Sequence, residues 1–148
     1  SIKETLLAAI DNAFAEIVPA RWATRANTTR QFKVFNDARA ILAGDVAHPI
    51  YSGELANQIG VSVRTLHDAI QRYRGVSLHR YLRLRRLWLV RKQLLAGAPS
   101  VKACALAYGF WHLSDFSRSY RSQFGEAPSE TLAASRARPD SSSGRHES

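Results

Sequence analysis

Residues 55–75 read LANQIGVSVRTLHDAIQRYRG, and residues 104–125 read CALAYGFWHLSDFSRSYRSQFG. The second stretch repeats the first at an offset of 49 positions up to a glycine turn and of 50 positions beyond it. It therefore carries one extra residue just after the turn. The matched pairs are Ala56 and Ala105, Gly60 and Gly109, and Val61 and Phe110, followed by Leu66 and Phe116, Ile70 and Tyr120, and Gly75 and Gly125.

Each copy has the form of a helix-turn-helix, in which a tight turn joins two helices. The small alanine allows the helices to approach closely, and the first glycine permits the sharp turn. Apolar residues four positions apart, such as Leu66 and Ile70, anchor the second helix on the core. Its opposite face is then free to enter a groove of DNA, so the repeat predicts two DNA-reading units.

Hydrophobic period and capping residues predict an all-α chain of two such units, joined by a long central helix and preceded by one or two linker helices. The five prolines fall between helical patterns, and six of the eight glycines, Gly44 among them, follow one as a C-cap. The expected helices cover about 2–17, 29–43 (with Phe32, Phe35, Ala38 and Leu42 on one stripe), 52–59, 62–74, 78–96, 100–108, 112–124 and a last helix from Pro128. Ser52, Ser62, Ser77 and Ser100 are expected at the starts of four of them.

The helix at 78–96 is expected to be the longest, with two apolar faces that pack against both units and fix their separation. One face holds Leu82, Leu87, Val90 and Leu94, and the other holds Leu84, Trp88 and Leu95.

Composition favours an anionic partner. The 148 residues include 21 Lys+Arg against 12 Asp+Glu, a net charge of +9, which points to nucleic acid before an acidic membrane surface. A hydrophobic content of 45% excludes general disorder, although residues 140–148 are polar and expected to be disordered. Charges interrupt every apolar stretch, so no membrane span or secretory leader is expected. The single Cys104 forms no internal disulfide, is expected to be a small buried hydrophobe, and fits a reducing, intracellular setting.

The sequence carries no constellation typical of catalysis. His48, His79 and His146 lack metal-ligand spacing, and neither a paired-carboxylate arrangement, a phosphate-binding glycine loop nor a nucleophile elbow is present. We expect no enzyme activity, no metal and no cofactor.

Over about 50–135 the sequence resembles the C-terminal DNA-binding domain of the AraC/XylS family of bacterial transcription regulators. The residues that carry the resemblance are Leu55, Ala56, Gly60, Val61, Ser62, Arg64, Leu66, Gly75, Tyr81, Leu82, Arg86 and Leu87 in the first motif and Ala105, Tyr108, Gly109, Phe110, Phe116, Arg118, Tyr120, Phe124, Gly125 and Pro128 in the second. The stretches at 109–113 and 124–132 are similar to the subgroup of ethanolamine-operon regulators.

The resemblance implies a bacterial transcription activator that is located in the cytoplasm and associated with the nucleoid. In this family the domain follows a ligand-binding or dimerisation domain, so the chain, which begins at Ser1 and lacks Met, is expected to be a fragment. The expected parts are 1–47 as the tail of that domain and a linker, 48–97 as the first motif with its connecting helix, 98–138 as the second motif and 139–148 as a tail. Expected partners are double-stranded DNA, RNA polymerase, an effector held by the missing domain, and a second copy of the chain. No membrane partner is expected.

The first recognition helix is predicted to present Ser62, Arg64, Thr65, His67, Asp68, Gln71 and Arg72 to DNA. Arg64 has the donors to pair with guanine, and Gln71 can pair with adenine. The resemblance implies Arg64, His67 and Asp68 as the base-facing set. Asp68 departs from the basic or amide residue usual there, and it either accepts from cytosine or braces Arg64.

The second recognition helix is predicted to present His112, Leu113, Ser114, Ser117, Arg118 and Arg121. The resemblance places Leu113, Ser114 and Arg118 toward DNA. Leu113 is either a core residue or a partner of a thymine methyl group, and we favour a partial version of the latter. This helix has fewer bidentate donors, so it is expected to add affinity more than sequence choice.

Residues 60–92 hold nine basic side chains and one acid, Asp68. Phosphates are their expected counter-charge, except that Arg86 is a candidate for a structural ion pair. The nine are Arg64, Arg72, Arg74, Arg80, Arg83, Arg85, Arg86, Arg91 and Lys92.

Three functions remain open on the sequence. The first is a sequence-specific regulator that reads two adjacent major-groove segments, a site of the order of 20 base pairs. The second is a nonspecific basic module for nucleic acid or membrane surfaces. The third is a helical protein-interaction module that dimerises through the apolar stripe at 2–17, unless that stripe is a seam to the missing domain.

Overall fold

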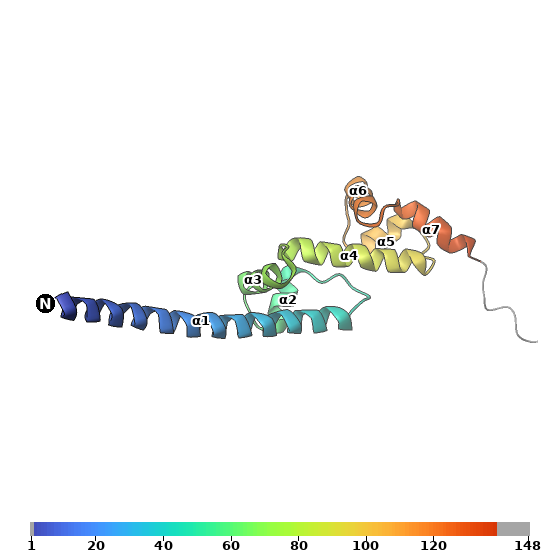
Figure 1. Cartoon of the computed structure of the whole chain (residues 1–148). Helices are drawn as coiled ribbons and strands as arrows, with labels where there is room; N and C mark the ends of the chain where they lie inside the picture. Colours follow the sequence, from blue (N-terminus) through green and yellow to red (C-terminus); the bar gives the residue numbers. More distant parts are fainter. Residues whose placement is uncertain (1, 139–148) are drawn as a thin grey trace, which may run out of the picture. The chain divides into compact units, whose positions relative to one another are not determined.

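The computed structural model describes residues 2–138, without the side chains of residues 7 and 10–24, and over this range it consists of α-helices with no strand (Figure 1). The all-α prediction is confirmed. The expected disordered tail lies outside the described residues. The helices are α1 (Ile2–Gly44), α2 (Ser52–Ile59), α3 (Val63–Arg74), α4 (Leu78–Leu95), α5 (Val101–Ala107), α6 (Leu113–Phe124) and α7 (Pro128–Ala137).

The helix α1 departs most from the sequence-based expectation. It runs without interruption through Pro19, where we expected a break. The separate helices expected at about 2–17 and 29–43 are therefore a single helix, which still agrees with the expected one or two linker helices. Among the described helices α1, and not α4 as expected, is the longest. A proline removes one backbone hydrogen bond, and the alanines and arginines that follow Pro19 are strong helix formers. Gly44 is the last residue of α1 and lacks the positive φ of a left-handed cap, unlike the other five glycines predicted to end helices.

The chain forms two compact units. The first contains the residues up to Ile41 together with Gly53–Leu78, and the second contains Leu42–Ser52 together with the residues from His79 onward. The two units do not follow the expected parts, which meet at 47/48 and 97/98. Nearly all of α4 and the segment after α1 pack in the same unit as the second motif.

The first unit buries one stripe from each of its helices. Leu66, Ala69 and Ile70 of α3 are fully buried, as is Ala38 of α1. Tyr73 of α3 is half-buried and stacks on Phe35 of α1, with ring centroids 5.0 Å apart. Phe32, predicted on the buried stripe, is instead 52% exposed, and Val34 is buried in its place.

The second unit has a larger, aromatic core. α5, α6 and α7 pack on one another (Figure 1). Phe110, Phe116 and Tyr120 are buried among aliphatic residues of α4. The first predicted face of α4 is confirmed, because Leu82, Leu87, Val90 and Leu94 are all buried. The second face is only partly correct: Leu84 packs on the core, whereas Trp88 and Leu95 are exposed.

The two copies of the repeat have the same backbone plan. Gly60 and Gly109 adopt φ values of +83° and +80°, which only glycine adopts readily. The residue after each glycine donates its N–H to the carbonyl of the small alanine, at 3.0 Å in both copies. Gly75 and Gly125 end α3 and α6 as left-handed caps. The repeat therefore predicted the backbone correctly in both halves.

Candidate nucleic-acid interface

Ser62 starts α3 as its N-cap, as the sequence predicts. Its hydroxyl accepts a hydrogen bond from the N–H of Thr65 at 3.1 Å and donates to the Thr65 hydroxyl at 2.9 Å. Both predicted site residues therefore lie at the first turn of the helix, and their hydroxyl groups already bond each other. Their main contribution is to fix where α3 begins.

The outward face of α3 is polar and open. Arg64, Asp68, Gln71 and Arg72 are all exposed, on the side opposite the buried Leu66 stripe. Within residues 2–138, Arg64 and Asp68 form no ion pair, so the structure gives no support to the idea that Asp68 braces Arg64. Both side chains keep their full hydrogen-bonding capacity for a partner.

His67 serves the fold as well as the surface. It is half-buried, and its Nδ1 accepts a hydrogen bond from the N–H of Leu78 at 3.4 Å. A ring nitrogen that accepts carries no proton, so in this arrangement Nε2 is the donor. His67 therefore fixes the end of the first unit, and only its Nε2 edge remains for a ligand.

α6 begins differently from α3. His112 is its N-cap residue but forms no side-chain capping bond, and it is exposed. Leu113 is half-buried and packs against the core of the second unit. Core packing therefore accounts for part of Leu113, and only its exposed part is free for a thymine methyl group.

The rest of the predicted face of α6 is exposed: Ser114, Ser117, Arg118 and Arg121. Arg118 donates to Asp115 at 2.6 Å, an exposed i, i+3 ion pair that we did not predict. The spacing of opposite charges three residues apart is the signal that could have revealed it. The pair offsets part of the positive charge that α6 offers to DNA.

Several of the nine basic residues are used inside the second unit rather than left for phosphates. Arg86 is 6% exposed and donates to the carbonyls of Tyr108 and Gly109, at 3.2 and 3.3 Å. Its guanidinium also lies over the rings of Tyr51 and Phe110. Burial lowers the pKa of Arg86. The structural role expected for Arg86 is correct, but carbonyl oxygens and aromatic rings take the place of the expected ion pair.

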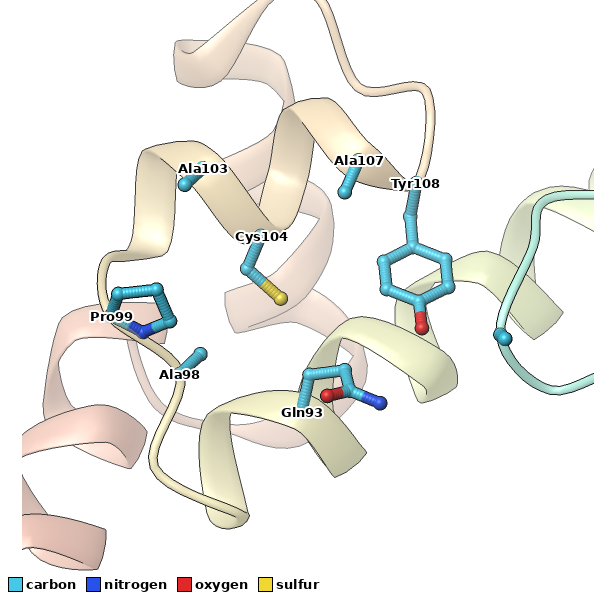
Figure 2. Close-up of a pocket in the computed structure, with 8 residues that line it drawn as sticks. Gln93, Ala98, Pro99, Ala103, Cys104, Ala107 and Tyr108 are labelled. Atoms are coloured by element: carbon cyan, nitrogen blue, oxygen red, sulfur yellow. The ribbon is translucent and has the colours of Figure 1, made fainter.

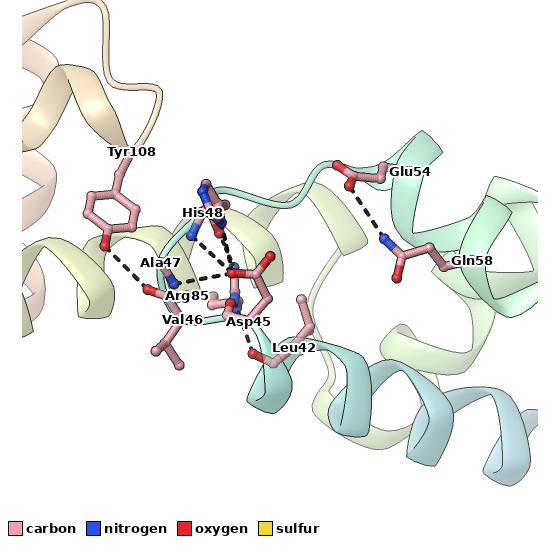
Figure 3. A network of polar contacts seen from close by, with 9 residues as sticks. All are labelled: Leu42, Asp45, Val46, Ala47, His48, Glu54, Gln58, Arg85 and Tyr108. Carbon is pink, nitrogen blue, oxygen red and sulfur yellow. Dashed lines mark hydrogen bonds and ion pairs between the residues drawn. The ribbon is translucent and has the colours of Figure 1, made fainter.

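Arg85 holds the segment that follows α1 (Figure 3). Its guanidinium donates to the carbonyls of Leu42, Asp45 and His48, and burial lowers its pKa. The hydroxyl of Tyr108 donates to the Val46 carbonyl at 3.3 Å. The side chain of His48 bonds the Asp45 carboxylate and holds the Asp45 pKa below its usual value.

Arg91 completes a polar network between α4, α6 and α7. It pairs with Glu126 at 3.2 Å, and the buried Thr131 hydroxyl donates to the same carboxylate at 2.6 Å. The Tyr120 hydroxyl in turn donates to Thr131 at 2.7 Å. The Thr131 hydrogen bond, helped by Arg91, lowers the pKa of Glu126.

The basic residues are thus divided between fold and surface. Arg83 donates to the Ser119 hydroxyl at 3.0 Å, and Arg74 lies over the Phe35 ring. Arg64, Arg72 and Lys92 are exposed and remain the clearest candidates for phosphates. The sequence showed an excess of positive charge, but it did not show that four arginines of α4 would bind groups of the second unit itself. These groups are backbone carbonyls for Arg85 and Arg86, the Ser119 hydroxyl for Arg83 and the Glu126 carboxylate for Arg91.

Cys104 is buried in the second unit, as predicted (Figure 2). Burial raises the pKa of its thiol. It lines a pocket of about 390 Å³ whose walls are mostly small apolar side chains of α5 and the preceding loop. In the described part of the chain, no helix is both long enough and apolar enough to cross a membrane.

The match to known proteins covers both motifs. Residues 55–134 match the family described as a helix-turn-helix domain. A probable AraC family transcriptional regulator from Rhodopseudomonas palustris CGA009 is 38% identical with a TM-score of 0.60, over 72% of this chain and 99% of that one. An AraC-type regulator from Chromobacterium violaceum is 28% identical with a TM-score of 0.62, over 75% of this chain and 98% of that one.

Curated relatives are longer. The XylDLEGF operon transcriptional activator 1 of Pseudomonas putida is 40% identical over 81 residues, 53% of this chain but 24% of that protein. The transcriptional activator RhaS of Pectobacterium atrosepticum is 32% identical over 87 residues, 59% of this chain and 31% of that protein. The narrower resemblance to ethanolamine-operon regulators stays an expectation. The chain belongs to the AraC/XylS family of transcription regulators, and its two helix-turn-helix motifs form the DNA-binding domain of that family.

Proposed function

We propose that α3 and α6 are the recognition helices of this regulator and that each reads one of two neighbouring major-groove segments. The observation that carries the proposal is that each helix buries its central anchors, Leu66 and Ile70 in α3 and Phe116 and Tyr120 in α6, and leaves the opposite face polar and exposed. A helix of this kind, at the second position of a helix-turn-helix, fits the major groove of B-DNA.

α3 is proposed to supply most of the sequence choice. Arg64 lies in its first turn, where side chains of a recognition helix reach base edges, and it has no acidic partner among the described residues. Its guanidinium can donate twice to guanine, and Gln71 can pair with adenine. Asp68 is proposed to accept from cytosine, since bracing of Arg64 is not observed.

α6 is proposed to supply affinity more than choice. Its exposed polar residues are Ser114, Ser117, Arg118 and Arg121, and Arg118 is already paired with Asp115. Hydroxyl groups and arginines bond phosphate oxygens without regard to sequence. With Arg72 and Lys92 they give a salt-dependent contribution to binding.

The wider setting is also part of the proposal. Relatives named as activators suggest that this protein activates transcription, through RNA polymerase, in the cytoplasm at the bacterial nucleoid. A domain outside this chain would bind an effector, and a second copy would form a homodimer. As a regulator, the protein is proposed to carry out no catalysis.

The test starts from duplexes selected out of random DNA by this chain. Their affinity is compared with that of a scrambled duplex of equal length at one fixed salt concentration. We expect the selected duplex to bind at least about a thousandfold more tightly, as specific DNA-binding proteins do. Equal affinities would show a nonspecific basic module instead.

A further inference from the structure

The second turn contains a residue that the first turn lacks. Val61 and Phe110 occupy equivalent positions, because each donates its N–H to the alanine carbonyl at 3.0 Å. Ser62 and His112 are the equivalent N-caps of α3 and α6. One residue, Trp111, therefore stands between two positions that are adjacent in the first unit. The structure places the extra residue of the repeat at Trp111.

Trp111 is directed outward by its neighbours. Phe110 is buried in the core, and α6 starts directly after His112, so the backbone on both sides of Trp111 is fixed. The Trp111 side chain is 74% exposed. Within residues 2–138 its indole forms no hydrogen bond and no ring contact. Tryptophan is enriched at interfaces, because its apolar ring carries one N–H donor.

The position of this turn favours DNA as the partner. Trp111 directly precedes His112, the N-cap residue of the proposed recognition helix α6. The acid nearest to Trp111 in the sequence is Asp115, and its carboxylate is paired with Arg118. A duplex read by α6 would therefore pass close to the indole.

We propose that Trp111 binds the sugar-phosphate backbone of DNA at the edge of the segment that α6 reads. This inference rests on the proposed function. The indole Nε1–H donates to a phosphate oxygen, and the ring covers the adjacent deoxyribose. Both contacts are independent of sequence, so Trp111 adds affinity for every duplex without changing the choice among them.

The experiment uses Trp111 as its own reporter. The chain has three tryptophans, and replacing Trp22 and Trp88 by Phe leaves Trp111 as the only one. The selected duplex is titrated into this variant while binding is followed by the anisotropy of a dye on the DNA. We expect the emission of Trp111 to change over the same range of DNA concentration as the anisotropy. A matched variant with Trp88 as the only tryptophan is expected to show no change in emission.

Affinity gives a second readout. Trp111→Ala is expected to lower the affinity for the selected and for the scrambled duplex equally, by about tenfold. Trp111→Phe keeps an aromatic ring but loses the N–H donor, so it is expected to lower both affinities by less. Circular dichroism confirms that both variants are folded, as the exposure of Trp111 predicts. If the DNA binds while the emission of Trp111 and the affinity of Trp111→Ala stay unchanged, the inference is wrong and the proposed function stands. If no duplex raises the anisotropy, both fail.

Discussion

α3 and α6 have the same length and the same left-handed glycine cap, and each follows a glycine turn, which is one residue longer before α6. They nevertheless use their outward faces differently. α3 presents Arg64 and Gln71 without an acidic partner among the residues that the structure describes, whereas the outward face of α6 is rich in serine and its Arg118 is held by Asp115. The comparison teaches that the repeated spacing fixes the backbone, while the residues between the anchors decide what each copy can recognise.

The interiors of the two units differ as well. α3 is anchored by the aliphatic Leu66 and Ile70, and α6 by the aromatic Phe116 and Tyr120. The first unit completes its core with the C-terminal part of α1, while the second uses α4, α5 and α7. The same motif can thus be completed by different supporting helices.

The largest expected effect breaks the anchor of the second unit. Phe116 is 1% exposed and packs against the rings of Phe110 and Tyr120, at 5.0 and 5.8 Å. Phe116→Ala should lower the free energy of unfolding by about 3–5 kcal/mol, because it removes a large apolar side chain and leaves a cavity. Urea unfolding measures the loss, and amide exchange should locate it in α5–α7.

The equivalent change in the first unit is Leu66→Ala, for which we expect about 2–5 kcal/mol. Amide exchange should then locate the loss in α2 and α3. A loss spread evenly over both units in either variant would contradict their description as separately packed cores.

The two turn glycines form a matched pair with different surroundings. A Cβ at Gly60 would have no neighbour within 4 Å, whereas a Cβ at Gly109 would collide with the Tyr51 hydroxyl and lie 3.0 Å from a nitrogen of Arg86. Gly60→Ala should lower the free energy of unfolding by about 1–2 kcal/mol, because alanine is strained at this positive φ. Gly109→Ala should cost roughly 1–3 kcal/mol more, measured by the same urea unfolding.

Tyr51→Ala provides the control for the turn. Combined with Gly109→Ala, it should recover part of the added cost, because the colliding group is gone. Equal costs for Gly60→Ala and Gly109→Ala would show that the approach of Tyr51 does not constrain the second turn.

The two recognition arginines test the division of labour on DNA. Arg64→Ala should reduce the discrimination between selected and scrambled duplexes by about 1–3 kcal/mol, since a bidentate base contact is lost. Arg118→Ala should lower the affinity for both duplexes alike. It should also reduce the slope of log affinity against log salt concentration by about one, because one phosphate contact is lost. Anisotropy titrations at several salt concentrations measure both. Reversed roles would assign sequence choice to α6.

The smallest expected effect concerns pH. Thr131 and Arg91 hold the pKa of Glu126 below its usual value, so the native state binds this proton less readily than the unfolded chain. The resulting stability is present above the unfolded pKa and is lost as pH falls through the lowered native pKa. The difference in urea midpoint between the wild type and Glu126→Gln should therefore shrink on acidification from neutral pH to below about pH 4.

Glu54→Gln is the matched change in the first unit. Glu54 is an exposed residue of α2, and its side chain bonds only that of Gln58 in the described part of the chain. Its effect on the midpoint should be small and should not follow the pH dependence of Glu126→Gln.

The repeat was enough to predict most of the fold, because Gly60, Gly109 and the apolar anchors are local signals of turn and stripe. Pro19 misled the prediction, since one lost hydrogen bond did not end α1. The site was harder to predict. Exposure followed from helix geometry for Arg64 and Gln71, but Arg85 and Arg86 bind carbonyls more than 20 residues away, and no local pattern reports such contacts.

The central claim is that both recognition helices engage one duplex. Hydroxyl-radical footprinting of the selected duplex, bound by the chain and by its Arg64→Ala and Arg118→Ala variants, tests it most directly. We expect two protected segments about one helical turn, roughly 10 base pairs, apart, with each variant weakening protection mainly in one of them. A single protected segment that both variants weaken equally would contradict the claim.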